Sequence, residues 1–367
     1  MSGYNNLKSR LENLLALGDV RIGGDRPWDI TVNNERFYRS ALAGGSVGLG
    51  ESYVEGWWDC AQLDEMIHRM LTADGVQRLL QSMWANAIAY VRATFVNLQS
   101  KTRSVRNVHE HYDIGNDLYR MMLDGRMVYS CGDWENAESL DEAQEAKLDF
   151  VCRKVGLAAG DVVLDIGCGW GSFAKFAAEK YGAAVVGITL SKEQAELARR
   201  RCARLPVEIR VQDYRDLREK FDHVISLGMF EHVGYKNYRH YMEVVQGCLR
   251  PGGRFFLECI GSNRSEHATD PWIDKYIFPG SMLPSIKQIG KAIEGLMITE
   301  ELQNWGPYYD KTLMLWYQNF HAHWNQMQKS YGDRFYRMWK YYLLISAGLF
   351  RSRAIQDWEI LLTPCNL

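Results

Sequence analysis

Hydrophobic and polar positions alternate in blocks through the middle of the chain. Short segments with the pattern of β-strands occur at 162–166, 184–190, 207–213, 223–229 and 254–261. Between them lie segments with helical periodicity, such as 192–205 and 235–249. Strands that alternate with helices usually pair in parallel, because each helix carries the chain back to the same edge of the sheet. The pattern therefore predicts an α/β fold with a doubly wound sheet and helices on both faces.

The first hundred residues follow a different pattern, which predicts a smaller, mainly helical unit. An amphipathic helix is expected at 7–18, a short strand at 29–34 and a long helix at 63–98. We expect an amino-terminal domain at 1–100 that contacts lipid, a polar linker at 101–108 and a catalytic domain at 109–367. The aromatic helical segments after residue 261 are expected to form a substrate lid in the catalytic domain.

The apolar run at 162–166 ends in a glycine-rich turn, with Asp165, Gly167, Gly169 and Gly171 at alternate positions. Glycine lets the backbone turn tightly and approach a ligand closely, and the start of the following helix leaves amide donors free. The spacing differs from the G-x-G-x-x-G of dinucleotide sites and is typical of an S-adenosylmethionine (SAM) site. On this motif alone, a glycine-rich strand-to-helix turn without a ligand stays open as the alternative.

Composition and charge narrow the functional classes. The net charge of −2 gives no indication of a nucleic-acid partner, and no run reaches the ~18 apolar residues of a membrane span. The first residues lack the apolar stretch and cleavage site of a signal peptide. The eight cysteines are scattered without a C-x-x-C pair, so we expect reduced thiols and a cytoplasmic location. The H-x-H pairs at 109–111 and 321–323 lack a recognised metal-ligand spacing, and no metal is expected.

Nine short motifs, in order along the chain, resemble those of the cyclopropane-fatty-acyl-phospholipid synthases and the related mycolic acid cyclopropane synthases. They are GLGESYVEGWWDC, HYDIGNDLYRMMLD, YSCGDW, VLDIGCGWGS, GITLSKEQ, QDYRD, GMFEHVG, DPWIDKYIFPG and YYDKTLMLWY. The resemblance implies a class I SAM-dependent methyltransferase fold. It also implies transfer of a carbon from SAM to the cis double bond of an unsaturated phospholipid acyl chain, leaving a cyclopropane ring. A homodimer is implied by the resemblance alone.

The resemblance also assigns SAM contacts outside the glycine turn. They are Tyr129 and Ser130 at the methionine carboxylate, Thr189 and Gln194 at the ribose, and Gln212 and Asp213 at the adenine.

The implied reaction needs a base, because an alkene that attacks the sulfonium methyl becomes a carbocation and the ring closes only when the transferred methyl loses a proton. In the resembled family this base is a bound bicarbonate, and Cys131, Glu231 and Tyr309 match three of the side chains that hold it. Aromatic faces stabilise a cation by about 0.5–2 kcal/mol each. The aromatic candidates are Tyr129, Phe230, Trp305, Tyr309 and Tyr317.

At one position the chain departs from the family pattern. It has Glu258 where the family motif L-H-x-I-G-S has histidine. A second carboxylate near Glu231 repels bicarbonate, unless one of the two carboxyls is protonated. Glu258 therefore either replaces bicarbonate as the proton acceptor, redirects the reaction to a methyl-branched or methylene product, or has a structural role.

Two other classes of function explain less of the sequence. A methyltransferase for a small O- or N-nucleophile leaves the aromatic richness and the first hundred residues unexplained. A binding module without catalysis is hard to reconcile with an intact glycine turn. We expect peripheral association with the inner face of the membrane, through Trp57 and Trp58 of the amino-terminal unit; packing inside that unit is the alternative for both tryptophans.

Overall fold

The protein was analysed as a computed structural model that describes residues 2–74 and 115–365. Contacts divide these residues into two compact units. The first unit contains residues 2–74, 270–277 and 310–355, and the second contains 115–269, 278–309 and 356–365. The boundary at residue 100 and the linker at 101–108 lie outside the described residues. The expected domain limits stay a prediction, and the contact grouping differs from them in placing 270–277 and 310–355 with the amino-terminal segment.

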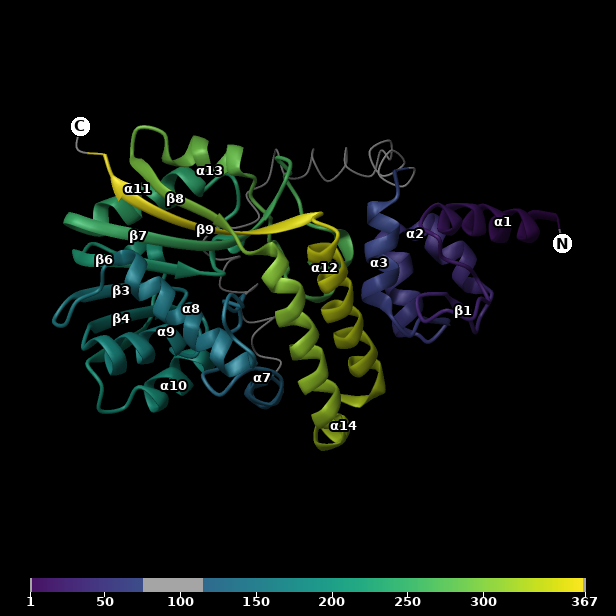
Figure 1. Cartoon of the computed structure of the whole chain (residues 1–367), viewed down its shortest axis with the longest axis horizontal. Helices are drawn as coiled ribbons and strands as arrows, with labels where there is room; N and C mark the ends of the chain where they lie inside the picture. Colours follow the sequence, from purple (N-terminus) through teal and green to yellow (C-terminus); the bar gives the residue numbers. More distant parts are fainter. Residues whose placement is uncertain (1, 75–114, 366–367) are drawn as a thin grey trace. The chain divides into compact units, whose positions relative to one another are not determined.

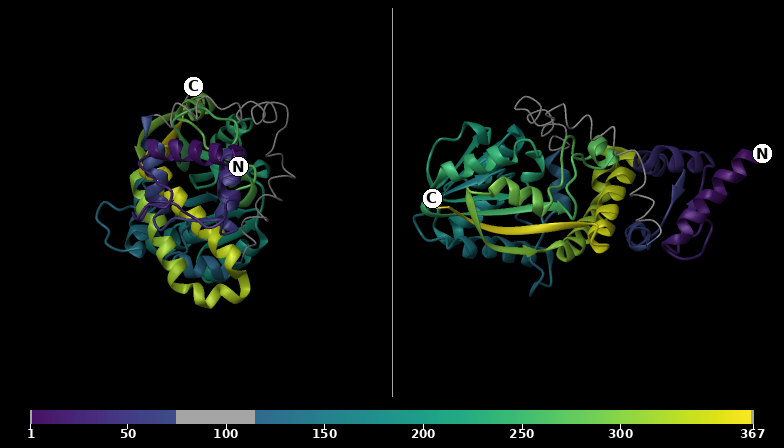
Figure 2. Two further views of the ribbon diagram at one scale, coloured as in Figure 1. Left: turned by 90° about the vertical axis from the view of Figure 1, so that its right-hand side faces the viewer. Right: turned by 90° about the horizontal axis from the view of Figure 1, so that it is seen from above.

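A mixed sheet forms the centre of the second unit. The five predicted strands are all present: β3 (Val162–Ile166), β4 (Ala184–Thr189), β5 (Val207–Val211), β6 (Phe221–Leu227) and β7 (Leu249–Ser262). Two strands that the sequence pattern did not predict, β8 (Met297–Asn304) and β9 (Ile355–Pro364), complete the order β5-β4-β3-β6-β7-β9-β8 in the described residues. Neighbours from β5 to β7 are parallel, whereas β8 and β9 are antiparallel. Yellow β9 runs along green β8 in the right panel of Figure 2.

Helices cover both faces of this sheet, as the alternating pattern predicts. Figure 1 shows α8, α9 and α10 on one face and α11 and α13 on the other. Their bounds are α8 (Leu140–Val155), α9 (Ser172–Phe176), α10 (Lys192–Arg201), α11 (Tyr238–Cys248) and α13 (Ile286–Ile293), and α7 (Asn116–Met122) precedes them. A π-helical turn, Ala177–Tyr181, extends α9.

Local sequence fixes the limits of α8. The Ser139 side chain accepts a hydrogen bond from the backbone N–H of Glu142, and the Glu142 side chain accepts one from the backbone N–H of Ser139. Together these two bonds form a capping box. The helix ends at Gly156, which has the left-handed conformation (φ 71°) that glycine adopts without strain.

The order of the strands places the functional edge of the sheet. Strands β3 and β6 are neighbours, but the chain continues from β3 to β4 on one side and from β6 to β7 on the other. The loops that follow β3 and β6 therefore leave the sheet in opposite directions. Doubly wound sheets bind ligands at such a switch point, outside the carboxyl ends of the strands. Below this edge, buried apolar side chains on the face covered by α11 and α13 anchor the central strands, among them Leu164, Ile166, Val224, Phe255 and Leu257.

The first unit is mainly helical. Its elements are α1 (Ser2–Leu17), β1 (Thr31–Val32), α2 (Arg36–Val54), β2 (Trp58–Asp59), α3 (Leu63–Thr72), α12 (Pro271–Tyr276) and most of α14 (Gly306–Arg351). The prediction of one continuous helix at 63–98 is wrong: α3 ends at Thr72 because the backbone of Ala73 is extended (φ −71°, ψ 121°), and residues 75–98 lie outside the described residues. Helix α14 changes direction at Gly332, whose backbone is non-helical (φ 75°). No helix in the described residues is both long enough and apolar enough to cross a membrane.

Trp58 belongs to the core of the first unit. Its side chain is 0% exposed, packs edge-on against Tyr53 with ring centroids 5.1 Å apart, and donates from Nε1 to Ser52 at 3.1 Å. The prediction that Trp58 reaches acyl chains is therefore wrong, because a buried and hydrogen-bonded indole has no free surface. Trp57 is half-buried and its contact with a membrane stays a prediction.

Candidate active site

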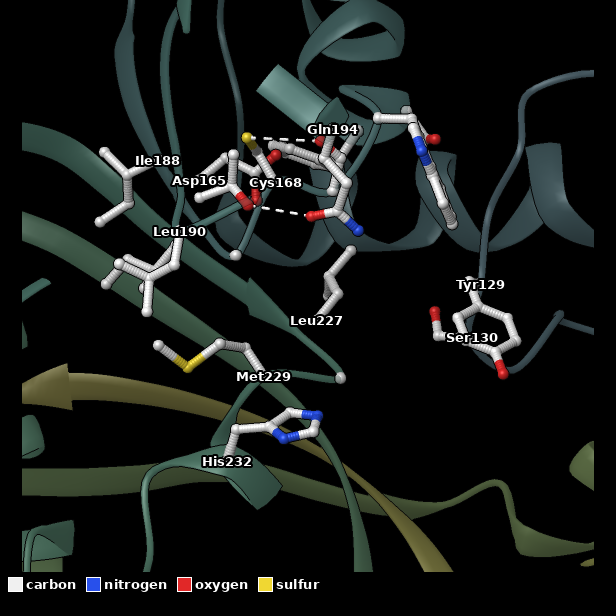
Figure 3. A pocket seen from close by; sticks show the side chains of 18 of the residues that line it. Tyr129, Ser130, Asp165, Cys168, Ile188, Leu190, Gln194, Leu227, Met229 and His232 are labelled. Atoms are coloured by element: carbon white, nitrogen blue, oxygen red, sulfur yellow. Dashed lines mark hydrogen bonds between the residues drawn. The ribbon is translucent and has the colours of Figure 1, made fainter. Parts of the chain in front are cut away.

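A pocket opens at the carboxyl edge of the sheet in the second unit. It is lined by the turns that follow β3, β4, β5 and β6, and by residues 127–130. Figure 3 shows Asp165, Cys168 and Gln194 on one side of it, Met229 and His232 on the opposite side, and Tyr129 and Ser130 on a third. The pocket thus lies where the switch-point argument and the glycine turn both place a ligand site.

The glycines of the turn are required by its geometry. Gly167 and Gly169 have φ of 85° and 52°, values that side chains rarely permit. A Cβ on Gly167 would lie 2.8 Å from the Cβ of Met229, so a larger residue would push into the opposite wall of the pocket. The backbone N–H groups of Gly167 and Cys168 both donate to the carbonyl of Ile188, at 2.9 and 3.0 Å, which holds the turn against β4.

Asp165 is the last residue but one of β3, directly before this turn. It is buried, and burial raises the pKa of its carboxyl to about 7. One of its oxygens, Oδ2, has no hydrogen-bond partner within the described part of the chain. An unpartnered carboxylate oxygen in a pocket wall costs free energy unless a donor or a cation reaches it, so Asp165 is suited to a polar or positively charged ligand.

The other predicted SAM residues line the same pocket. Thr189 Oγ1 donates to Oε1 of Gln194 at 2.9 Å, and Asp213 forms a two-oxygen ion pair with Arg215, with both contacts at 2.7 Å. All the predicted cofactor residues line the pocket except Gly171, which precedes α9 with φ 77°. The roles assigned to the individual residues stay predictions.

Three of the predicted catalytic residues lie on elements beside the pocket rather than on its wall. Cys131 is fully buried, and burial raises the pKa of its thiol. Glu231, in the 3-10 turn after β6, accepts a 2.6 Å hydrogen bond from the backbone N–H of Ile260. Burial raises the pKa of the Glu231 carboxyl to about 7. Tyr309 is buried near the start of α14, where its backbone N–H and the Cys131 thiol both donate to the Trp305 carbonyl.

Glu258 is held in a buried ion pair. Its Oε2 lies 2.8 Å from the Nζ of Lys147, and the two side chains are 1% and 0% exposed. The hydroxyl of Ser130 donates to the same oxygen at 3.2 Å, and the backbone N–H of Cys131 donates to Oε1 at 3.3 Å. The structure therefore brings Glu258 and Cys131 together, and connects both to the pocket through Ser130 and Lys147, which line it.

Lys147 is one of three residues near Glu258 that were not predicted from the sequence. It follows Leu140 and Ala143 at helical spacing on the buried face of α8, so a lysine on an apolar stripe was a readable signal. Asp357 and Glu359 on β9 were also missed, because no strand was predicted there. Their carboxylate oxygens and one of Glu258 lie within 4.8 Å of one another.

The aromatic candidates are dispersed. Tyr129 lines the pocket, whereas Phe230 is fully buried and stacks on Tyr238 with ring centroids 4.3 Å apart. Trp305 packs on Phe150 with centroids 4.8 Å apart. Tyr317 belongs to the first unit.

Comparison with known proteins decides the family. The family model for mycolic acid cyclopropane synthetase matches residues 99–360, which is most of the chain. The chain belongs to this family. The resemblance seen in the nine motifs is thereby confirmed, as is the fold expected for a class I methyltransferase.

Two curated relatives show how far the likeness extends. The cyclopropane-fatty-acyl-phospholipid synthase of Escherichia coli K12 is 47% identical over 347 residues, covering 95% of this chain and 91% of that protein. A probable fatty acid methyltransferase of Pseudomonas putida is 37% identical over 277 residues, covering 71% of this chain and 70% of its own length.

Solved structures agree with this assignment. The cyclopropane synthase MmaA2 of Mycobacterium tuberculosis superposes with a TM-score of 0.67 at 28% identity, and covers 70% of this chain and 97% of its own. The mycolic acid cyclopropane synthase CmaA1, solved in complex with SAH and CTAB, has a TM-score of 0.66 at 31% identity with the same coverage.

Proposed function

We propose that this chain transfers the methyl carbon of SAM to the cis double bond of an unsaturated phospholipid acyl chain and closes a cyclopropane ring. The observation that carries the proposal is the pocket over the glycine turn, lined by the residues that the family motifs assign to SAM. The 47% identity to the E. coli synthase, over nearly the whole of both chains, supports the phospholipid substrate.

SAM fits the residues present. The positive φ values of Gly167 and Gly169 leave backbone space for the methionine part, and the unpartnered Asp165 oxygen accepts a donor. Thr189 and Gln194 offer polar atoms to the ribose, and Gln212 offers them to the adenine. When bound, SAM supplies an electrophilic methyl group. We propose that Cys131, Glu231, Glu258 and Tyr309 act where the transferred carbon loses its proton.

The alternative product has weaker support. Two relatives that match 95% of this chain are named cyclopropane-fatty-acyl-phospholipid synthase. The relatives named as fatty acid or tuberculostearic acid methyltransferases match 71–84% of it. We therefore propose the ring-forming reaction in preference to a methyl-branched or methylene product. We also propose peripheral contact with the inner face of the membrane and a homodimer, as expectations from the family.

Labelled SAM and phospholipid vesicles test the function. We expect label to enter unsaturated phospholipid and not its saturated counterpart, and proton NMR of the extracted lipid to show upfield ring-methylene signals. Label in both lipids or in neither would contradict the substrate, and a one-carbon mass gain without ring signals would contradict the product.

A matched pair of glycine variants tests the SAM site. Gly167→Ala should weaken SAM binding at least about tenfold, because its Cβ enters the pocket against Met229, and about 1.4 kcal/mol is enough for that loss. Gly182→Ala is the control, since Gly182 also has positive φ (68°) but lies at the end of the π-helical turn outside the pocket. Equal SAM affinities, measured by calorimetry, would contradict the assigned site.

A further inference from the structure

Three buried carboxyls from two strands share one site behind the pocket. Glu258 on β7 and Asp357 and Glu359 on β9 are all 2% exposed or less. One oxygen of each lies within 4.8 Å of the others. Neither oxygen of Asp357 or of Glu359 has a hydrogen-bond partner in the described residues. These three side chains are called the carboxyl cluster below.

The charges around the carboxyl cluster do not balance if all three groups are ionised. Lys147 supplies one positive charge, and it is already in contact with Glu258. The other titratable groups that interact with the cluster, Cys131, Asp133, Glu231 and Cys259, are acids and supply no positive charge. Two carboxylates would then be buried without a counter-charge, which proteins avoid by keeping such groups neutral.

The environment of each group indicates where the protons are. Burial, followed by repulsion from Glu258, raises the pKa of both Asp357 and Glu359 well above the ordinary range of a carboxyl. Burial acts to lower the pKa of Lys147, but the attraction and hydrogen bond to Glu258, together with the neighbouring acidic groups, outweigh burial and the pKa is raised. Glu258, which accepts hydrogen bonds from Ser130, Lys147 and the Cys131 backbone, is therefore the ionised member.

We propose that the carboxyl cluster carries a single negative charge, with Asp357 and Glu359 protonated at neutral pH and Glu258 as the ionised member that accepts the proton lost during ring closure. This inference rests on the proposed function. The C–H bond of the transferred methyl breaks, its electron pair forms the last C–C bond of the ring, and the proton moves to a Glu258 oxygen. Asp357 and Glu359 act as positioning residues, because neutral carboxyls beside Glu258 add no second charge to the site.

The path back to water follows from the contacts of Ser130. Its hydroxyl lies 3.2 Å from Glu258 Oε2 and 2.5 Å from Lys147 Nζ, and Ser130 and Lys147 both line the pocket. After the product leaves and water enters the pocket, the proton on Glu258 can pass through this hydroxyl to solvent.

Infrared spectroscopy tests the protonation without any assay of activity. At pH 7, the wild-type protein should show carbonyl bands of protonated carboxyls that are absent from Asp357→Asn and Glu359→Gln. Glu138→Gln, at an exposed position of the same unit, is the control and should remove no such band. Unchanged protonated-carboxyl bands in both cluster variants would overturn the proposal. So would a divalent cation, supplied as Mn²⁺, that remains bound through dialysis in the wild type and is lost in Asp357→Asn.

Product analysis tests the role of Glu258. Glu258→Gln should retain SAM binding and release S-adenosylhomocysteine, but form less than about a tenth of the wild-type ring product. Asp357→Asn and Glu359→Gln keep a neutral side chain but cannot ionise, so their pH profiles for ring formation should differ from that of the wild type on the alkaline side. Normal ring formation by Glu258→Gln would overturn the proposal. If the wild type converts no unsaturated phospholipid, the proposed function fails, and the infrared result still decides the protonation state.

Discussion

The buried ion pair between Lys147 and Glu258 makes a quantitative prediction about stability. Lys147→Met keeps the length of the side chain and removes its charge, leaving Glu258 ionised and unpaired at a position that is 1% exposed. Removing one partner of a buried pair costs about 3–5 kcal/mol, because the remaining charge keeps its desolvation penalty. We expect a loss of unfolding free energy of that size at pH 7.

The same helix supplies the control. Lys154 on α8 pairs with Glu301, but these side chains are 26% and 34% exposed, so water screens the pair. Lys154→Met should cost no more than about 1 kcal/mol. Urea denaturation followed by circular dichroism measures both variants. A Lys147→Met protein as stable as Lys154→Met would refute the argument that Lys147 and Glu258 are a desolvated, charged pair.

The stability of the Lys147→Met variant should depend on pH through the carboxyl of Glu258. Without Lys147, the folded state favours a protonated Glu258, so it binds more protons than the unfolded state between mildly acidic and neutral pH. Stability then falls as pH rises through that range. The cost of Lys147→Met should therefore be smaller at pH 5 than at pH 7. Adding Glu258→Gln should recover at least about 1 kcal/mol of the loss at pH 7, because the unpaired charge is gone.

Two further predictions concern packing and capping. Ser139→Ala removes the cap of α8 and should lower the unfolding free energy by about 1 kcal/mol; an unchanged urea midpoint would contradict the capping box. Gly187→Ala places a Cβ 2.8 Å from Ile209 Cδ1 and 2.9 Å from Cys168 Cβ, and should cost about 1–3 kcal/mol through overpacking. Adding Ile209→Val should recover part of this cost in the same assay, and no recovery would argue against the clash.

Much of the catalytic unit could be predicted because its signals are local. The strands β3 and β4 have nearly continuous apolar runs, since both faces of a central parallel strand are buried, and the edge strand β5 alternates apolar and charged residues. The turn at Gly167 and Gly169 was readable because its backbone conformation requires glycine. In both cases a few adjacent residues determine the local backbone conformation.

The strands β8 and β9 could not be recognised for two different reasons. Strand β8 is at the edge of the sheet and mostly exposed, so its sequence is largely polar. Strand β9 is almost entirely buried but contains Asp357 and Glu359, residues that a sequence pattern assigns to a surface. What makes them tolerable in the core is the surrounding site, which is assembled from distant parts of the chain.

Long-range contacts also decide the character of Glu258. The sequence shows a carboxylate in place of the family histidine, but its counter-ion comes from a helix 111 residues earlier. With Lys147 in place, Glu258 is a paired carboxylate, although its charge still helps to raise the pKa of Glu231. The buried groups without a counter-charge are then Asp357 and Glu359, whose oxygens have no hydrogen-bond partner in the described residues. The replacement at position 258 and the acidic residues of β9 therefore belong to one electrostatic unit, and substituting any member changes the proton affinity of the others.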